Sequence, residues 1–156
     1  MIRIRPYRET DAEALAEVFE RAVRGIGSRD YSPAQIEAWI GREPRADRFR
    51  AKMADGRRCW VATDDGGRVM AFVDLEADGH IDFLFADPEV AGQGVASRLV
   101  DMLEAAARGD GVTRLYVEAS EAARRFFLRR GYTVQGRRDF EIAGVAIHNY
   151  AMERAL

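Results

Sequence analysis

The alternation of apolar and polar residues predicts strands and amphipathic helices along the whole chain. Alternation favours a strand at residues 2–7, and apolar runs separated by turn residues favour strands at 58–63, 68–77 and 80–86. Further strands are expected at residues 113–118, 132–142 and 145–153. Helical periodicity predicts one helix from residue 10 through Val23, a short one through Trp39, and others over residues 46–54, 94–108 and 121–130. Because no repeat, linker or low-complexity segment interrupts this order, we expect one domain over residues 1–156.

Cap residues refine the helix starts. Thr10-Asp11-Ala12-Glu13 and Ser32-Pro33-Ala34-Gln35 both fit the capping-box pattern, in which two side chains satisfy free backbone N–H groups. Proline at the first helical position strengthens the second box. We therefore expect helices to begin at both places.

Asp78-Gly79 predicts a two-residue hairpin turn before the strand at residues 80–86. Since side chains alternate along a strand, this turn would put His80 and Asp82 on one face of the sheet. Asp74 and Glu76 would then lie on the opposite face.

Composition narrows the classes of partner. The chain has 156 residues, 47% of them hydrophobic, and 24 basic against 26 acidic residues, which argues against nucleic acid or an anionic membrane as a partner. Cys59 is the only cysteine and lies in an apolar run, so we expect a buried structural thiol and no intramolecular disulfide. No apolar run reaches ~18 residues, so the sequence predicts a cytoplasmic protein; a homodimer remains possible.

A glycine-rich turn at residues 91–94 joins the apolar run at 81–86 to the helix predicted at 94–108. Gly92 and Gly94 allow a close approach of the backbone to an anion, and the first helical turn offers free N–H groups. The P-loop pattern fails because the turn lacks lysine, and the dinucleotide pattern fails because Ser97 replaces its third glycine. The turn still favours phosphate binding.

Two segments resemble motifs of the GCN5-related N-acetyltransferases (GNAT). Residues 91–96 resemble the pyrophosphate-binding motif [QR]-x-x-G-x-[GA], with Ala91 in place of the usual Gln or Arg. Residues 120–132 are similar to N-x-x-A-x-x-[LF]-Y-x-x-x-G-[FY], with Ser120 at the first position and Phe127 in place of the tyrosine. The motifs occur in the family's order and separation, and the resemblance covers most of the chain.

The resemblance implies an α/β (α+β) GNAT acyl-CoA N-acyltransferase fold. Its mixed, mostly antiparallel sheet would have about seven strands, with helices on both faces and two neighbouring strands splayed apart around the cofactor. It also implies acetyl-CoA as co-substrate and no metal. The cofactor-binding residues that it implies are Leu84, Phe85 and Ala86 for pantetheine, Ala91, Gly92, Gln93, Gly94, Val95, Ala96 and Ser97 for pyrophosphate, and Ser120, Ala123 and Phe127 at the thioester end.

The implied reaction is transfer of an acetyl group to a primary amine of a small molecule or peptide by direct attack in a ternary complex. An amine is mostly protonated at neutral pH, so a base must take its proton. Family members carry the base on the strand before the pyrophosphate turn, which points to His80 and Asp82, with Glu76 as a third candidate.

The residue that protonates the leaving thiolate is harder to assign. The family's tyrosine aligns with Phe127, which cannot donate a proton. Tyr31 is our substitute, since it lies in the loop that overhangs the acceptor site in this fold; Tyr132 and Tyr150 are weaker candidates, expected to pack with their hydroxyls at the surface. Two other functions stay open: a non-catalytic acyl-CoA-binding or sensing module, and an unrelated phosphate or nucleotide binder.

Overall fold

A computed structural model describes residues 1–41 and 45–156. Its strands are β1 (Arg3–Pro6), β2 (Arg58–Thr63), β3 (Val69–Leu75), β4 (His80–Ile81), β5 (Leu84–Ala86), β6 (Arg114–Ala119), β7 (Thr133–Ile142) and β8 (Val145–Ala155). Its α-helices are α1 (Ala12–Gly25), α2 (Pro33–Ile40), α3 (Arg45–Met53), α4 (Val95–Gly109) and α5 (Glu121–Arg129), and short 3₁₀ turns cover η1 (Glu9–Asp11), η2 (Gly27–Arg29) and η3 (Pro88–Val90).

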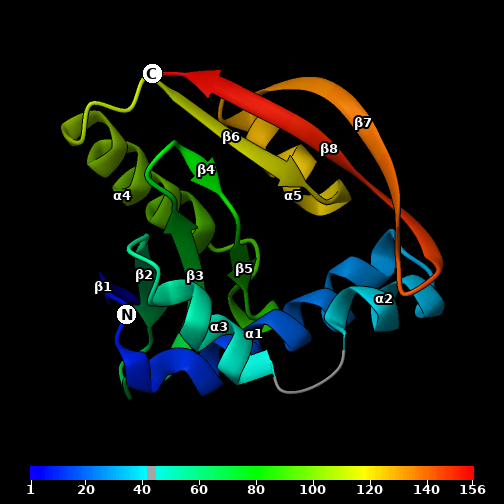
Figure 1. Cartoon of the computed structure of the whole chain (residues 1–156). Helices are drawn as coiled ribbons and strands as arrows, with labels where there is room; N and C mark the ends of the chain where they lie inside the picture. Colours follow the sequence, from blue (N-terminus) through cyan, green and yellow to red (C-terminus); the bar gives the residue numbers. More distant parts are fainter. Residues whose placement is uncertain (42–44) are drawn as a thin grey trace.

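The strands form two four-stranded sheets, β1-β2-β3-β5 and β4-β6-β8-β7. Only the β4–β6 pair is parallel among the described strands. The sheets diverge between β5 and β6 (Figure 1). This confirms the mixed, mostly antiparallel α/β (α+β) architecture and the splayed strands.

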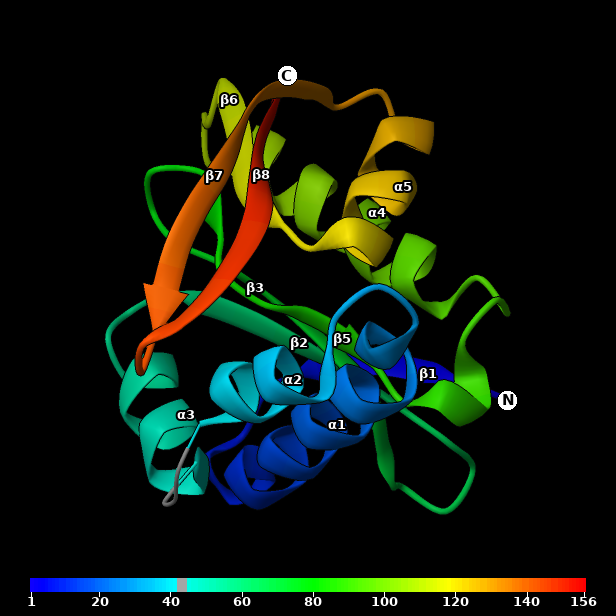
Figure 2. The same ribbon diagram turned by 90° about the vertical axis from the view of Figure 1, so that its right-hand side faces the viewer.

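Helices α1 and α4 cover opposite faces of the first sheet (Figure 2). Alternate side chains of β3 explain why: Phe72 packs in one apolar cluster with Phe19 of α1, while Ala71 and Val73 pack in another with Leu99 of α4. A strand that is buried on both faces has apolar side chains at nearly every position, and β3 has such a sequence. Helix α5 instead packs beside β6, β7 and β8.

One of the two predicted capping boxes forms. The Gln35 N–H donates to Ser32 Oγ (3.2 Å) and the Ser32 N–H donates to Gln35 Oε1 (2.8 Å). The box predicted from Thr10 to Glu13 is wrong, because the Asp11 carboxylate accepts the Arg8 N–H (2.8 Å) and pairs with Arg5 (2.8 Å). These contacts order a 3₁₀ turn first, so α1 begins at Ala12.

The run at residues 80–86 is two strands rather than the one expected. The buried Asp74 carboxylate in β3 accepts the N–H groups of Asp82 (3.0 Å) and Phe83 (2.6 Å) through Oδ1. The Asp74 side chain, rather than a backbone carbonyl, is therefore the acceptor for these two N–H groups. The strand ends here, and the residues on either side of the break belong to different sheets. β4 pairs with β6 and β5 pairs with β3.

Gly79 allows β4 to approach β6. Its φ is +97°, and a Cβ there would lie 2.1 Å from the carbonyl oxygen of Arg114. The Tyr116 N–H donates to the Gly79 carbonyl (3.1 Å) at the same contact. Any side chain would force β4 and β6 apart.

The predicted separation of Asp74 and Glu76 from His80 and Asp82 is also wrong. The Arg57 guanidinium contacts Asp74 (2.6 Å), Glu76 (2.9 Å) and Asp82 (3.0 Å), and the His80 ring contacts Glu76 (3.2 Å). The turn is one residue longer than the expected two: the Gly79 N–H donates to the Glu76 carbonyl (3.0 Å) and the Glu76 N–H donates to the His80 carbonyl (2.8 Å). Glu76 therefore lies opposite His80, and their side chains share a face.

His80 lies between two carboxylates. Its Nε2 is 2.8 Å from Glu118 Oε1, and its Nδ1 is 3.2 Å from Glu76 Oε2. The hydrogen bond to Glu118 is the largest influence and, with Glu76, raises the pKa of His80 to about 9 against the opposing effect of burial. The ring is therefore an imidazolium at neutral pH.

We predict that His80 makes folding stability fall as the pH rises through about 9. Its folded-state pKa exceeds the ordinary 6.5, so between these values the folded protein holds a proton that the unfolded chain has released. The stabilisation is complete below pH 6.5 and lost above 9. Urea unfolding of wild type and His80→Gln should show a stability difference at pH 6 that closes at pH 10; a constant difference would contradict the assignment.

Candidate active site

Two cavities meet in the gap between the sheets. The first, of about 320 Å³, extends from η2 past β5 and the glycine turn to α5. The second, of about 280 Å³, lies between α1, residues 82–85, the end of β6 and the β7–β8 hairpin. Both are lined by Tyr31, Trp39, Leu84, Phe85, Ser120 and Ala123. A ligand in each cavity would therefore meet its neighbour beside β5.

The glycine-rich turn and the start of α4 lie at one end of the first cavity, where Ala91, Gly92 and Ala96 are part of its lining. Gly92 (φ +78°) and Gly94 (φ +80°) have left-handed backbones, and a Cβ on either would meet no atom within 4 Å. The first helical hydrogen bond of α4 runs from the Arg98 N–H to the Gly94 carbonyl (3.1 Å). The N–H groups of Val95, Ala96 and Ser97 thus have no acceptor within the helix, at the positive end of its dipole.

Asp87 anchors this turn to α1. Its buried carboxylate accepts the Glu89 N–H (3.0 Å) and pairs with Arg21 Nε (2.6 Å). The hydrogen bond from Arg21 holds the pKa of Asp87 below its ordinary value. An ionised side chain therefore fixes the start of the turn.

The edge of β5 that faces the gap has free backbone groups. In the β3–β5 pair, the Asp74 N–H donates to the Phe83 carbonyl (3.2 Å) and the Asp87 N–H donates to the Met70 carbonyl (2.7 Å). Antiparallel hydrogen bonding alternates, so the N–H and C=O of Leu84 and Ala86 point away from β3. They face the side on which the described chain places no neighbouring strand.

Tyr31 and the start of α5 border both cavities. Ser120 caps α5, its Oγ accepting the Ala123 N–H (3.3 Å). The Tyr31 hydroxyl accepts the Glu121 N–H (3.1 Å) and donates to the His148 carbonyl (3.0 Å). Burial raises the pKa of Tyr31, so the phenol keeps its proton at neutral pH.

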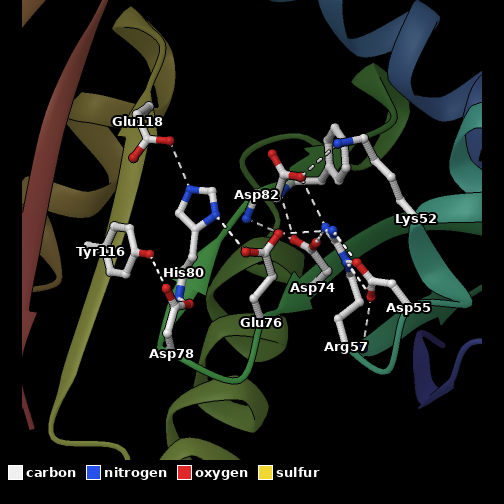
Figure 3. Close-up of polar contacts among 11 residues, drawn as sticks. Lys52, Asp55, Arg57, Asp74, Glu76, Asp78, His80, Asp82, Tyr116 and Glu118 are labelled. Atoms are coloured by element: carbon white, nitrogen blue, oxygen red, sulfur yellow. Dashed lines mark hydrogen bonds and ion pairs between the residues drawn. The ribbon is translucent and has the colours of Figure 1, made fainter.

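Two carboxylates, Asp82 and Glu118, line the second cavity. Asp82 Oδ2 is held by Arg57 (3.0 Å) and Lys52 (3.4 Å), and Glu118 Oε1 by His80 (2.8 Å) (Figure 3). Each lies two residues from a residue that both cavities share, Leu84 or Ser120. His80 itself is in the lining of neither cavity, and both of its nitrogens are occupied.

The other tyrosine candidates lie elsewhere. Tyr132 is only 1% exposed, and its hydroxyl donates to Glu104 Oε2 (3.0 Å), so the expected surface position is wrong. The Tyr150 hydroxyl contacts Glu121 (3.4 Å). Phe127 is fully buried and lines the second cavity without a hydroxyl.

Sequence reasoning missed several polar residues of the second cavity. They are Arg48, Glu118, Arg138, His148 and Asn149. Only the register of β6, β7 and β8 and the fold of the hairpin over α2 and α3 bring them together. Cys59 is buried, as expected.

Among residues 1–41 and 45–156, no helix combines the length and hydrophobicity needed to cross a bilayer. The same residues contain no group of three or more side chains placed to hold a metal ion.

Comparisons with known proteins agree with this geometry. A GNAT acetyltransferase domain model matches residues 28–154. The uncharacterized N-acetyltransferase YafP of Escherichia coli is 34% identical over 97% of this chain and 94% of its own length. The peptidyl-lysine N-acetyltransferase YjaB of Salmonella typhimurium is 28% identical over 92% of each chain.

Solved structures show the same fold. A GCN5-related N-acetyltransferase from Rhodopseudomonas palustris has a TM-score of 0.91 and 33% identity, covering 99% of this chain and 95% of that one. PaiA N-acetyltransferase of Thermoplasma acidophilum, in complex with coenzyme A, has a TM-score of 0.76 at 17% identity over 100% and 99% of the chains. The chain belongs to the GNAT family of N-acetyltransferases.

Proposed function

We propose that this protein transfers the acetyl group of acetyl-CoA to a primary amine by direct attack in a ternary complex. The observation that carries the proposal is the meeting of two cavities beside β5. One has a phosphate-binding turn at its end, and the other contains carboxylates. Structures with bound coenzyme A or acetyl-CoA among the neighbours, PaiA and YncA of Salmonella typhimurium, support acetyl-CoA as the first ligand.

Acetyl-CoA would occupy the first cavity. The N–H groups of Gly92 and of residues 94–97 would bind the pyrophosphate, whereas the Gln93 N–H already donates to the Val90 carbonyl (3.2 Å). Because the Ala91 side chain carries no polar group, the backbone alone would make these contacts. The amides of pantetheine would pair with the free edge of β5 at Leu84 and Ala86, as an added strand does. Ser120, Ala123 and Phe127 would surround the thioester at the junction with the second cavity.

The acceptor amine would enter through the second cavity. Its nitrogen attacks the thioester carbonyl, the C–S bond breaks, and the products are an amide and the thiol of CoA. Asp82 accepts the proton that the nitrogen loses, with Glu118 as the second candidate because it is the other carboxylate in the lining of the same cavity. His80 is already protonated, so we assign it to holding Glu118 rather than to taking a proton.

Tyr31 would protonate the leaving thiolate. It lines both cavities and retains its proton, and Phe127 supplies none. To donate, the hydroxyl must exchange its bond to the His148 carbonyl for one to sulfur.

A non-catalytic acyl-CoA sensor is the second candidate function. It is favoured by Phe127 and by the engagement of the Tyr31 hydroxyl with two backbone groups. Release of CoA thiol on incubation with acetyl-CoA and an amine panel separates the two: transfer gives amine-dependent thiol, whereas a sensor binds CoA and releases none.

Gly94→Glu should abolish CoA binding in isothermal titration calorimetry, because a carboxylate would occupy the pyrophosphate position. Gly94→Ala is the matched control: it imposes the same left-handed strain, about 1–2 kcal/mol, without charge. It should retain measurable affinity. Unchanged affinity in Gly94→Glu would remove the turn from the site.

Asp82→Asn should lower kcat by roughly 10²–10⁴-fold, the usual range for a lost general base. The pH profile should shift and the CoA dissociation constant should stay nearly unchanged, because Asp82 lines only the second cavity. Glu118→Gln is the parallel variant. Normal turnover in Asp82→Asn together with a large loss in Glu118→Gln would reassign the base to Glu118.

Tyr31→Phe should slow the chemical step by ~10²-fold or more while CoA binding persists. Tyr31→Phe also removes the hydrogen bonds of the hydroxyl to two backbone groups. Single-turnover rates are therefore compared between Tyr31→Phe and the double variant Tyr31→Phe/Phe127→Tyr, which regains a phenol but not those bonds. Partial recovery in the double variant would identify the lost function as proton donation. Wild-type turnover in Tyr31→Phe would restrict Tyr31 to shaping the cavities.

A further inference from the structure

The second cavity, in which we place the acceptor amine, has equal numbers of acidic and basic side chains in its lining but not a neutral electrostatic field. Its lining contains two acidic residues, Asp82 and Glu118, and two arginines, Arg48 and Arg138. Counted alone, these charges cancel. The electrostatic field inside the cavity depends on which of these four side chains are paired with an opposite charge outside it.

Both acids are paired with cations (Figure 3). Asp82 pairs with Arg57, whose side chain is 5% exposed, and with Lys52. Glu118 pairs with the His80 imidazolium. None of these three cations lines the cavity.

Neither arginine of the lining has an acidic partner in the described part of the chain. The Arg48 guanidinium lies over the Phe19 and Phe49 rings, at 5.8 and 5.6 Å from their centroids. Arg138 lies over Phe140 (5.3 Å) and donates to Asn149 Oδ1 (3.0 Å). Its neighbour Arg137, in contrast, pairs with Asp139 (3.0 Å) and is not part of the lining.

Much of the remaining wall is apolar. It includes Phe19, Phe83, Phe140, Ile142 and Ile147. The cavity therefore combines apolar surface with two guanidinium groups that retain donors for an anion, and a planar guanidinium matches a carboxylate in a forked pair.

We propose that the acceptor is a small amine that also carries a carboxylate on an apolar body, as an apolar amino acid does. Arg48 and Arg138 bind the carboxylate, the aromatic and aliphatic wall holds the body, and the amine points toward Asp82 and the thioester. The positive field of the arginines also favours the neutral, attacking form of the amine. This inference rests on the proposed function and adds its substrate class.

A binding experiment tests the carboxylate site without requiring turnover. The probe 3-phenylpropionate carries the carboxylate and the apolar body but no amine, and phenethylamine carries the amine without the carboxylate. In the presence of CoA, calorimetry should show 3-phenylpropionate binding that Arg138→Gln and Arg48→Gln weaken by roughly ten- to a hundredfold, the range for a hydrogen bond to a charged group. Arg137→Gln should leave it unchanged. No binding, or equal binding in all variants, would overturn the inference.

Turnover then separates this inference from the proposed function. CoA release from acetyl-CoA is measured with phenylalanine, leucine and methionine, with their decarboxylated amines and with a lysine peptide. Higher kcat/KM for a carboxylate-bearing amine, lost in Arg138→Gln through KM, supports the inference. Transfer to amines or to the peptide with no carboxylate preference overturns it and leaves the proposed function standing. No amine-dependent release from any acceptor overturns both.

Discussion

The buried carboxylate of Asp74 holds the strand break on which the site depends. It accepts two consecutive backbone N–H groups and the Arg57 guanidinium. Burial raises the pKa of Asp74 to about 6, against the hydrogen bonds from Phe83 and Arg57, so the group remains largely ionised at neutral pH. Removing one partner of such a pair leaves an uncompensated buried charge, at a cost of roughly 3–5 kcal/mol.

The break determines what the two sheets can do. β4 belongs to one sheet and β5 to the other, so a gap opens beside Leu84. The edge of β5 that faces this gap is left without a neighbouring strand among those described. The same break brings Asp82 into the lining of the second cavity, while Arg57 pairs with Asp82, Asp74 and Glu76 together. Strand geometry, cofactor edge and acceptor wall therefore have a common origin.

Much of the fold follows from local pattern. The apolar run at residues 59–62 and the caps at Ser32 and Ser120 are local signals, and they predict the positions of β2, α2 and α5 to within a residue or so. The split at residues 82–83 could not be predicted in this way, because the apolar run at residues 81–86 extends across it and its cause is a side chain eight positions earlier.

The residues of the candidate site also differ in whether the local sequence could predict them. The glycine turn carries its own motif, and its left-handed φ angles confirm the expected backbone. In contrast, Glu118 and His80 are 38 residues apart and meet only through the β4–β6 register, and Arg138 reaches the cavity through the β7–β8 hairpin. Long-range pairing of this kind leaves no local signal in the sequence.

The central claim is that CoA and the acceptor occupy separate cavities that meet beside β5. NMR titration of the protein with CoA tests it most directly. The account predicts shifts in the amide resonances of Leu84, Ala86 and residues 92–97, with Arg138 and Asn149 unchanged until an acceptor is added. Shifts centred on Arg138 and Asn149 with CoA alone, and none in residues 92–97, would contradict it.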